Sequence, residues 1–190
     1  MNYNFNNTTP DAKSIIHLIA QQGDNLIGLE LGVLKGESFC CMLDSCPNIK
    51  TLYGIDTWEP YDDYLAAEHR TTPVYSVDKK TQEVNEFLTR HNIKWCNNGH
   101  KAKIIKKDSN KCASKFKNNY LDFIFFDTYM TREQAIKDLE LWIPKIKKGG
   151  LVMGHDWGAI DIEETVLNYR KKHNIKNILS VYDNTWVWRK

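Results

Sequence analysis

LDFIFFD, residues 121–127, is the stretch that decides the fold. Its apolar run is nearly unbroken and ends on an acid, Asp127. Such runs are typical of strands at the buried centre of a parallel sheet, where helices cover both faces and leave no solvent-facing side. The pattern therefore predicts an α/β protein in which this segment is a central strand.

Shorter apolar runs and helical patterns alternate on both sides of this segment, as they do in a sheet built from strand–helix–strand units. Further strands are expected at residues 26–31, 51–56, 102–107, 151–156, 178–182 and 185–188. Helices are expected from Pro10, from Gly36, from Ser76 to about His91, from Thr131 to the stop signal at 147–150, and over 160–173. The last two strands are joined by the turn signal Asp183-Asn184 and must be antiparallel. We expect a seven-stranded, mostly parallel sheet with a C-terminal antiparallel β-hairpin and helices on both faces.

Length and composition fit one globular domain over residues 1–190, with 26% charged and 42% hydrophobic residues. Residues 1–25 are expected to form an N-terminal helical cap. Residues 57–75 are aromatic, charged and proline-containing, and we interpret them as a long loop that could act as an active-site lid. No apolar run approaches the ~20 residues that cross a bilayer, and the N-terminus lacks a signal-peptide pattern. The sequence thus predicts a cytoplasmic protein with no membrane partner.

Charge and cysteine content disfavour several classes of protein. The net charge of +2 is too small to imply a polyanionic partner. The lysines between Lys94 and Lys117 are not interleaved with an aromatic stacking platform, so we expect a solvated basic face and no nucleic-acid partner. The five cysteines form no C-x-x-C pair, which favours reduced thiols over disulfides or structural zinc. A homo-oligomer stays open.

Acidic or polar residues end four of the expected strands: Glu30, Asp56, Asp127 and the pair His155-Asp156. The carboxyl ends of parallel strands meet at one edge of a sheet, and ligands bind in the crevice beyond that edge. The turn ELGVLKG, residues 30–36, carries glycines that allow close backbone approach to a ligand. It lacks the G-x-G-x-x-G spacing that wraps a pyrophosphate, which disfavours a dinucleotide oxidoreductase.

These motifs, in this order, resemble class I S-adenosylmethionine (SAM)-dependent methyltransferases. E-x-G-x-x-x-G, formed by Glu30, Gly32 and Gly36, resembles their motif I. Residues 53–58, YGIDTW, resemble the next motif, and residues 107–109, KDS, the adenine-side motif. Residues 121–157 resemble the stretch from motif IV through the following strand, in wording closest to the methyltransferase domain 24 branch, which is often seen with small-molecule and sugar-type substrates. The resemblance covers residues 26–188.

The resemblance implies a Rossmann-like class I methyltransferase fold and SAM as cofactor. It implies methyl transfer to a small-molecule acceptor, most naturally at oxygen; the alternative is a SAM-binding regulatory or interaction protein without transfer activity. The implied SAM contacts are Glu30, Gly32, Gly36, Ser38, Asp56, Trp58, Asp108, Ser109 and Asp127. Simpler interpretations remain beside them: a tight strand–helix turn for motif I, and helix caps for Asp56 and Asp108.

One departure from the branch concerns motif IV. The branch commonly has D-x-x-H-S-Y after the strand, and this chain has methionine, Met130, where the histidine stands. Any role of that histidine is therefore absent or has moved.

Catalysis is assigned to His155 and Asp127, which end neighbouring strands. His155 is a candidate general base, with a structural hydrogen bond as the alternative. Asp127 and Asp156 match positions that hold Mg²⁺ in some relatives, but Asp156 could simply cap the following turn, and no third oxygen ligand is evident. The sequence therefore favours the metal-free interpretation modestly and leaves Mg²⁺ open.

Overall fold

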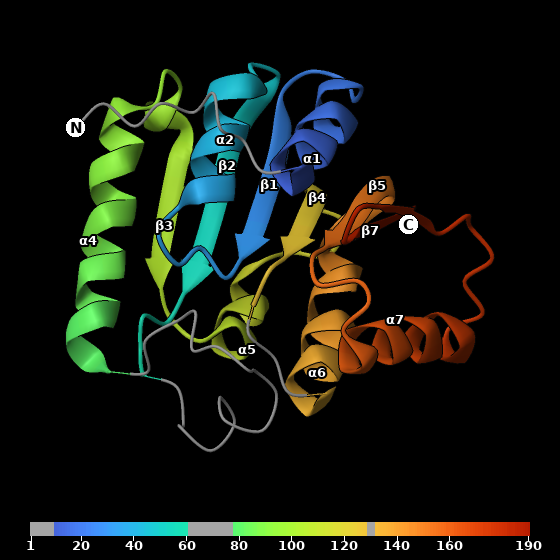
Figure 1. Ribbon diagram of the computed structural model, residues 1–190. Coiled ribbons are helices and arrows are strands. Elements are labelled where there is room, and N and C mark those ends of the chain that lie inside the picture. Colours follow the sequence, from blue (N-terminus) through green and yellow to red (C-terminus); the bar gives the residue numbers. More distant parts are fainter. Residues whose placement is uncertain (1–9, 61–77, 129–131) are drawn as a thin grey trace.

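The computed structural model describes residues 10–60, 78–128 and 132–190, and its core is one seven-stranded sheet of order β3-β2-β1-β4-β5-β7-β6 (Figure 1). The strands are β1 (Leu26–Leu31), β2 (Ile49–Asp56), β3 (Ala102–Lys106), β4 (Leu121–Phe126), β5 (Ile146–Gly154), β6 (Ser180–Tyr182) and β7 (Thr185–Arg189). Strands β1 to β5 pair in parallel, and β7 pairs antiparallel with both β5 and β6. The expected mostly parallel sheet with a C-terminal hairpin is confirmed.

Helices cover both faces of this sheet. They are α1 (Pro10–Ala20), α2 (Glu37–Ser45), α4 (Lys79–Trp95), α5 (Ser109–Cys112), α6 (Arg132–Trp142) and α7 (Ile160–Lys172), with short 3₁₀ turns η2 (Gly99–Lys101), η3 (Ala113–Lys115) and η4 (Ile143–Lys145). Helices α1, α2 and α4 pack on the face that carries Phe123 and Phe125, and α5, α6 and α7 pack on the face that carries Ile124 and Phe126. The central strand thus feeds two hydrophobic cores, because successive side chains of a strand point to opposite faces.

The strand order reverses between β1 and β4, since the chain runs from β1 outward through β2 to β3 and then returns to the other side of β1. The two carboxyl ends are tied together where the backbone N–H of Asp127 donates to the carbonyl of Leu31 at 2.8 Å. Ligands of open α/β sheets bind at such a switch point. The topology therefore predicts the ligand-binding edge of the sheet beside the carboxyl ends of β1 and β4.

Some element bounds differ from the sequence-based expectation. The helix expected from Thr131 to 147–150 ends at Trp142, and β5 already begins at Ile146. The glycines interpreted as a helix stop belong to the strand: a Cβ on Gly150 would lie 2.6 Å from the carbonyl oxygen of Asp122, so glycine lets the strand backbones approach. Helix α4 runs to Trp95, beyond the expected His91.

Two segments of the expected architecture fall partly outside the described residues. Of the N-terminal cap, the structure describes α1 from Pro10 onward; of the lid expected over 57–75, it describes 57–60. Ser76 also lies outside, and the described start of α4 is capped by Asp78, whose carboxylate accepts from the N–H of Thr81 at 2.9 Å. No helix among the described residues is long and apolar enough to cross a membrane.

Candidate active site

The turn from β1 to α2 is held against the end of β4 by backbone packing. Gly32 has φ +81°, and a Cβ there would lie 2.1 Å from the carbonyl oxygen of Asp127. The N–H of Gly32 donates to the carbonyl of Ile55 at 2.9 Å, which ties the same turn to β2. Gly36 also has φ +81° and precedes the first residue of α2. The two glycines of motif I are therefore required by backbone conformation, and at Gly32 by space as well.

Glu30 and Ser38 lie together beneath this turn. The Ser38 hydroxyl donates to Oε1 of Glu30, whereas Oε2 is buried without a hydrogen-bond partner. Full burial raises the pKa of Glu30 well above its usual value, the Ser38 hydrogen bond lowers it, and the nearby Asp127 and Asp56 raise it further. Three carboxyl groups thus converge where β1, β2 and β4 end, and the buried one favours its neutral form.

Asp56, at the end of β2, shapes the turn with its carboxylate. Its Oδ2 accepts from the N–H groups of Val33 and Leu34, both at 2.8 Å. Its Oδ1 accepts from the N–H of Trp58 at 2.9 Å. A carboxylate offers about four acceptor positions, so this pattern leaves capacity for a ligand hydroxyl. Asp56 is the residue that was expected to bind the ribose hydroxyls of SAM. Its hydrogen bonds show that it also orders the motif I turn.

Helix α4 supports the same turn from behind. The carbonyl of Leu34 accepts from the Trp58 indole N–H at 2.8 Å and from the Thr89 hydroxyl at 2.7 Å. Asn92 donates to the carbonyl of Lys35 at 3.4 Å. The Trp58 indole is buried, so this expected SAM contact lies within the packing around the turn. Sequence analysis missed Thr89 and Asn92, although the polar stripe 82, 85, 89 and 92 repeats at helical spacing.

Asp108 and Ser109 follow β3 and engage the start of α5. The Asp108 carboxylate accepts from the N–H of Asn110 at 2.9 Å, which is the helix-cap arrangement kept open in the sequence analysis. The Ser109 hydroxyl donates to Asp138 at 2.6 Å. Burial raises the pKa of Asp138 above its usual value, while the bonds from Ser109 and Gln134 lower it. These contacts fix the loop that would face adenine.

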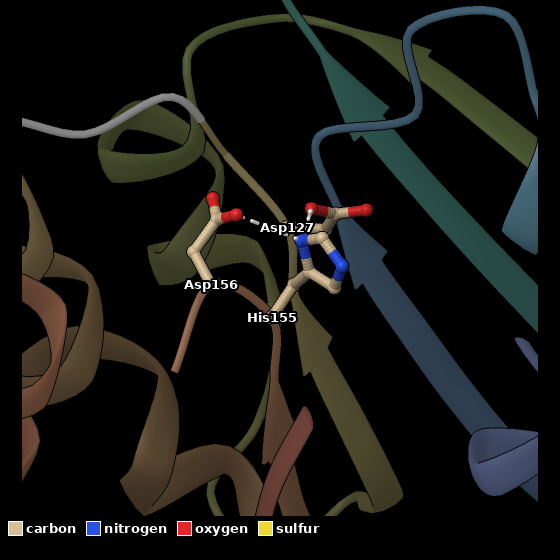
Figure 2. A group of neighbouring side chains, drawn as sticks. All are labelled: Asp127, His155 and Asp156. Atoms are coloured by element: carbon tan, nitrogen blue, oxygen red, sulfur yellow. Dashed lines mark ion pairs between the residues drawn. The ribbon is translucent and has the colours of Figure 1, made fainter. Parts of the chain in front are cut away.

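Asp127, His155 and Asp156 come together at the ends of β4 and β5, and Figure 2 shows the imidazole beside the two carboxylates. His155 Nδ1 lies 3.1 Å from Oδ1 of Asp156 and 3.5 Å from Oδ1 of Asp127. The N–H of His155 donates to the carbonyl of Phe126 at 3.0 Å, which keeps the two strand ends in register. All three side chains are partly exposed, so ligands can reach them.

The same three side chains could also hold a cation, because one ligand atom from each lies within 4.8 Å of the others. From the sequence, Asp127 and Asp156 were predicted as metal ligands and His155 as a separate general base. In the structure all three side chains lie in one cluster. The polar and aromatic residues Tyr61, Tyr64, Glu68 and His69 of the expected lid 57–75 lie outside the described residues, as does Met130.

Comparison with known proteins identifies the family of the chain. Residues 29–157 match the family model of methyltransferase domain 24, which is described as a methyltransferase domain. No curated protein matches the chain in sequence.

Several solved structures share the fold. The O-methyltransferase NovP has a TM-score of 0.70 at 17% identity, over 95% of this chain and 79% of NovP. SMU.1697c, a putative methyltransferase from Streptococcus mutans in complex with S-adenosylhomocysteine (SAH), has a TM-score of 0.67 at 12% identity. The match covers 96% of this chain and 99% of SMU.1697c. A putative rRNA-methylase from Clostridium thermocellum has a TM-score of 0.64 at 12% identity, over 95% of each chain.

Such low identities establish the fold alone, whereas the family match spans most of the chain. The chain therefore belongs to the methyltransferase domain 24 family and is a class I SAM-dependent methyltransferase.

Proposed function

We propose that this protein transfers the methyl group of SAM to an oxygen atom of a small-molecule acceptor, and that His155 accepts the acceptor's proton. The observation that carries the proposal is the cluster of His155 with Asp127 and Asp156 at the crevice edge, 3.5 and 3.1 Å from Nδ1. A hydroxyl acceptor must lose a proton as it is methylated, and a positioned histidine is the commonest group for that task. NovP, which shares the fold, is an O-methyltransferase.

The cofactor site would be built by the ends of β1, β2 and β4. The motif I turn from Gly32 to Gly36 would lie against the methionine part of SAM, Asp56 would accept from the ribose hydroxyls, and Asp127 would pair with the ammonium group. Two observations support this placement. The close approach at Gly32 holds the turn against the end of β4, beside Asp127, and the buried Oε2 of Glu30 without a hydrogen-bond partner lies at the end of β1. Bound SAM supplies a methyl group that is activated by its sulfonium and leaves SAH behind.

The chain's own part in the reaction is alignment and proton removal. With its proton on Nδ1, the His155 ring donates toward the carboxylates of Asp156 and Asp127, which fixes the ring and makes Nε2 the basic atom. The negative charge of the two carboxylates favours the imidazolium that forms when Nε2 takes the proton. Alignment of the acceptor with the methyl group can contribute roughly 7–11 kcal/mol toward the barrier.

A divalent cation is the alternative use of the same cluster. Asp127 and Asp156 would supply oxygen ligands and His155 a nitrogen, and a cation there would acidify the acceptor hydroxyl. Mg²⁺ prefers oxygen ligands throughout, so the imidazole between the carboxylates favours the metal-free base.

We place the reaction in the cytoplasm, in keeping with the free, buried cysteines.

The test measures SAH formation with a panel of phenols, catechols, sugars, carboxylic acids and amines, and with RNA as a separate arm. We expect turnover with a hydroxyl acceptor. His155→Asn should lower that turnover by at least about 100-fold while SAH affinity stays within a few-fold. His173→Asn is the matched control, because His173 also lies beside a carboxylate, Glu140 at 3.0 Å, but at the far end of α7. Turnover confined to RNA or amines, or an active His155→Asn, would overturn the proposal.

A further inference from the structure

Helix α4 buries four polar side chains and exposes its largest apolar ones. The buried ones are Gln82, Asn85, Thr89 and Asn92, of which Thr89 and Asn92 bond the motif I turn. On the outside, Phe87 is 65% exposed and Trp95 is 75% exposed, and Val84 is 47% exposed. A surface helix normally buries its apolar stripe. The outward apolar side of α4 therefore calls for a partner.

The outward side chains form one continuous aromatic stripe, which we define as Val84, Phe87, His91 and Trp95. The rings of Phe87 and His91 stack at 5.8 Å, and those of His91 and Trp95 lie 6.2 Å apart. The Trp95 indole N–H donates to Nε2 of His91 at 3.2 Å. The stripe is thus an ordered surface, and a contiguous exposed apolar patch of this kind is typical of an interaction site.

The spacing of the aromatic stripe indicates which shape it fits. Its members are three, four and four residues apart, which keeps them on one straight line along the helix. An average spacing close to the 3.6 residues of a helical turn keeps side chains on one face, and such a face is what one helix packs against another. Helix α4 also lies at the outer end of the molecule, beside the edge strand β3, where a second molecule can reach it (Figure 1). The natural occupant of the stripe is therefore a helix.

The charges beside the stripe favour a second copy of α4 in antiparallel orientation. Glu83 flanks the N-terminal half of the stripe and Lys94 the C-terminal half. A two-fold axis beside residue 89 would bring Glu83 to within about one residue of the level of the partner subunit's Lys94. A parallel pairing would leave Glu83 level with the partner's Glu83 and would form no such pair. Glu86 contributes nothing here, because it already pairs with Arg90 at 2.9 Å and Lys106 at 2.6 Å.

The same axis matches the apolar side chains. Phe87 would lie level with the partner's His91 near the centre, and Val84 would lie within about one residue of the level of the partner's Trp95. Each large side chain then has an apolar or aromatic neighbour. An isologous interface requires this self-complementarity of one patch. We infer that the aromatic stripe of α4 is the interface of a homodimer in which two α4 helices pack antiparallel.

A dimer of this kind would act on the cofactor site through a single helix. The inner side of α4 bonds the carbonyls of Leu34 and Lys35 through Thr89 and Asn92. Packing two α4 helices together would restrict that helix and hence the motif I turn. The dimer itself does not depend on the proposed acceptor, so the two proposals can fail separately.

The experiment is sedimentation velocity on the full chain over a wide concentration range. The wild-type chain is expected to sediment as a dimer. Phe87→Glu should raise the dimer dissociation constant roughly 100-fold or more, since a central aromatic residue is lost from both sides of the interface. Ile178→Glu is the matched control, because Ile178 is 84% exposed outside α4 and should leave the dimer intact. Unchanged circular dichroism spectra and cooperative urea unfolding in both variants would show that they fold.

A charge exchange tests the orientation. Glu83→Lys should weaken the dimer, and the double variant Glu83→Lys with Lys94→Glu should restore it. Several results would overturn the proposal: a wild-type monomer at every concentration, a dimer that tolerates Phe87→Glu, or a double variant no better than the single one. A monomer whose tryptophan fluorescence shifts with anionic vesicles or with RNA, and whose shift is lost in Trp95→Phe, would identify a different occupant and overturn it equally.

Discussion

The crevice has two sides that are built in different ways. On the motif I side, backbone groups make the site: Gly32 packs against the backbone of Asp127, and Asp56 accepts N–H groups from the turn. On the β4–β5 side, side chains make it: Asp127, His155 and Asp156 are partly exposed, and Nδ1 of His155 lies within 3.5 Å of both carboxylates. Backbone sites depend on fold and should fail together with it, whereas side-chain sites should lose chemistry and keep the fold.

The largest effect that separates the two sides is expected from Gly32→Ala. The new Cβ would lie 2.1 Å from a backbone oxygen at φ +81°, so a strand end must shift. We expect a loss of roughly 3 kcal/mol or more in unfolding free energy and loss of SAH binding, measured by urea unfolding and calorimetry.

Gly149→Ala separates the two causes of that loss. Gly149 has the same φ of +81° but nothing within 4 Å of its added Cβ, so only backbone strain remains. The substitution Gly149→Ala should lower the unfolding free energy by about 1–2 kcal/mol. Equal costs at the two glycines would show that the close approach to Asp127 has no energetic weight.

The next effect is a pH dependence carried by Glu30. Burial holds its pKa well above the ordinary 4.5. Below that ordinary value both the folded and the unfolded state keep the proton; above it the unfolded state releases the proton first. The unfolding free energy therefore falls as pH rises, by up to about 1.4 kcal/mol per unit until the folded pKa is reached.

Glu30→Gln should remove this slope and make the protein more stable than wild type at neutral pH, as measured by urea unfolding from pH 4 upward. Glu140→Gln gives the opposite sign, because Lys172 and His173 lower the pKa of Glu140, and its contribution is present at neutral pH and lost toward acid pH. Parallel profiles for wild type and Glu30→Gln would mean that Glu30 is charged in the folded protein.

A smaller effect is expected where α4 supports the turn. Thr89→Val removes the hydroxyl that donates to the carbonyl of Leu34 at 2.7 Å. A neutral hydrogen bond contributes about 1 kcal/mol, so SAH affinity should fall about fivefold. Thr165→Val is the control, because the buried hydroxyl of Thr165 has no hydrogen-bond partner. A changed turnover number with unchanged affinity would place Thr89 in the chemistry instead.

The sequence predicted the sheet well because its signals are local. The apolar run 121–126, the acids at strand ends and the Asp183-Asn184 turn each act within a few residues. The prediction for residues 147–150 was wrong, because glycines can end a helix or let two strands approach closely. Only the tertiary contact with Asp122 distinguishes a helix stop from a strand here. Likewise, spacing placed Asp127 and Asp156 on one edge but could not show that the His155 ring lies between their carboxylates, because a side-chain torsion decides that.

The smallest expected effect is that of a chelator, and it bears on the side-chain half of the crevice. If the imidazole of His155 orients on the carboxylates of Asp127 and Asp156, as Nδ1 distances of 3.5 and 3.1 Å favour, removal of divalent cations should leave turnover within twofold. Asp156→Asn should then lower turnover about 10-fold, because the ring keeps a hydrogen-bond partner but loses a charge that stabilises the imidazolium. A cation would reverse this order: chelation would abolish turnover, Mg²⁺ or Mn²⁺ would restore it, and Asp156→Asn would raise the metal concentration required. Measuring SAH formation across a Mg²⁺ titration, in wild type and in Asp156→Asn, therefore decides whether this half of the crevice works as a base or as a metal centre.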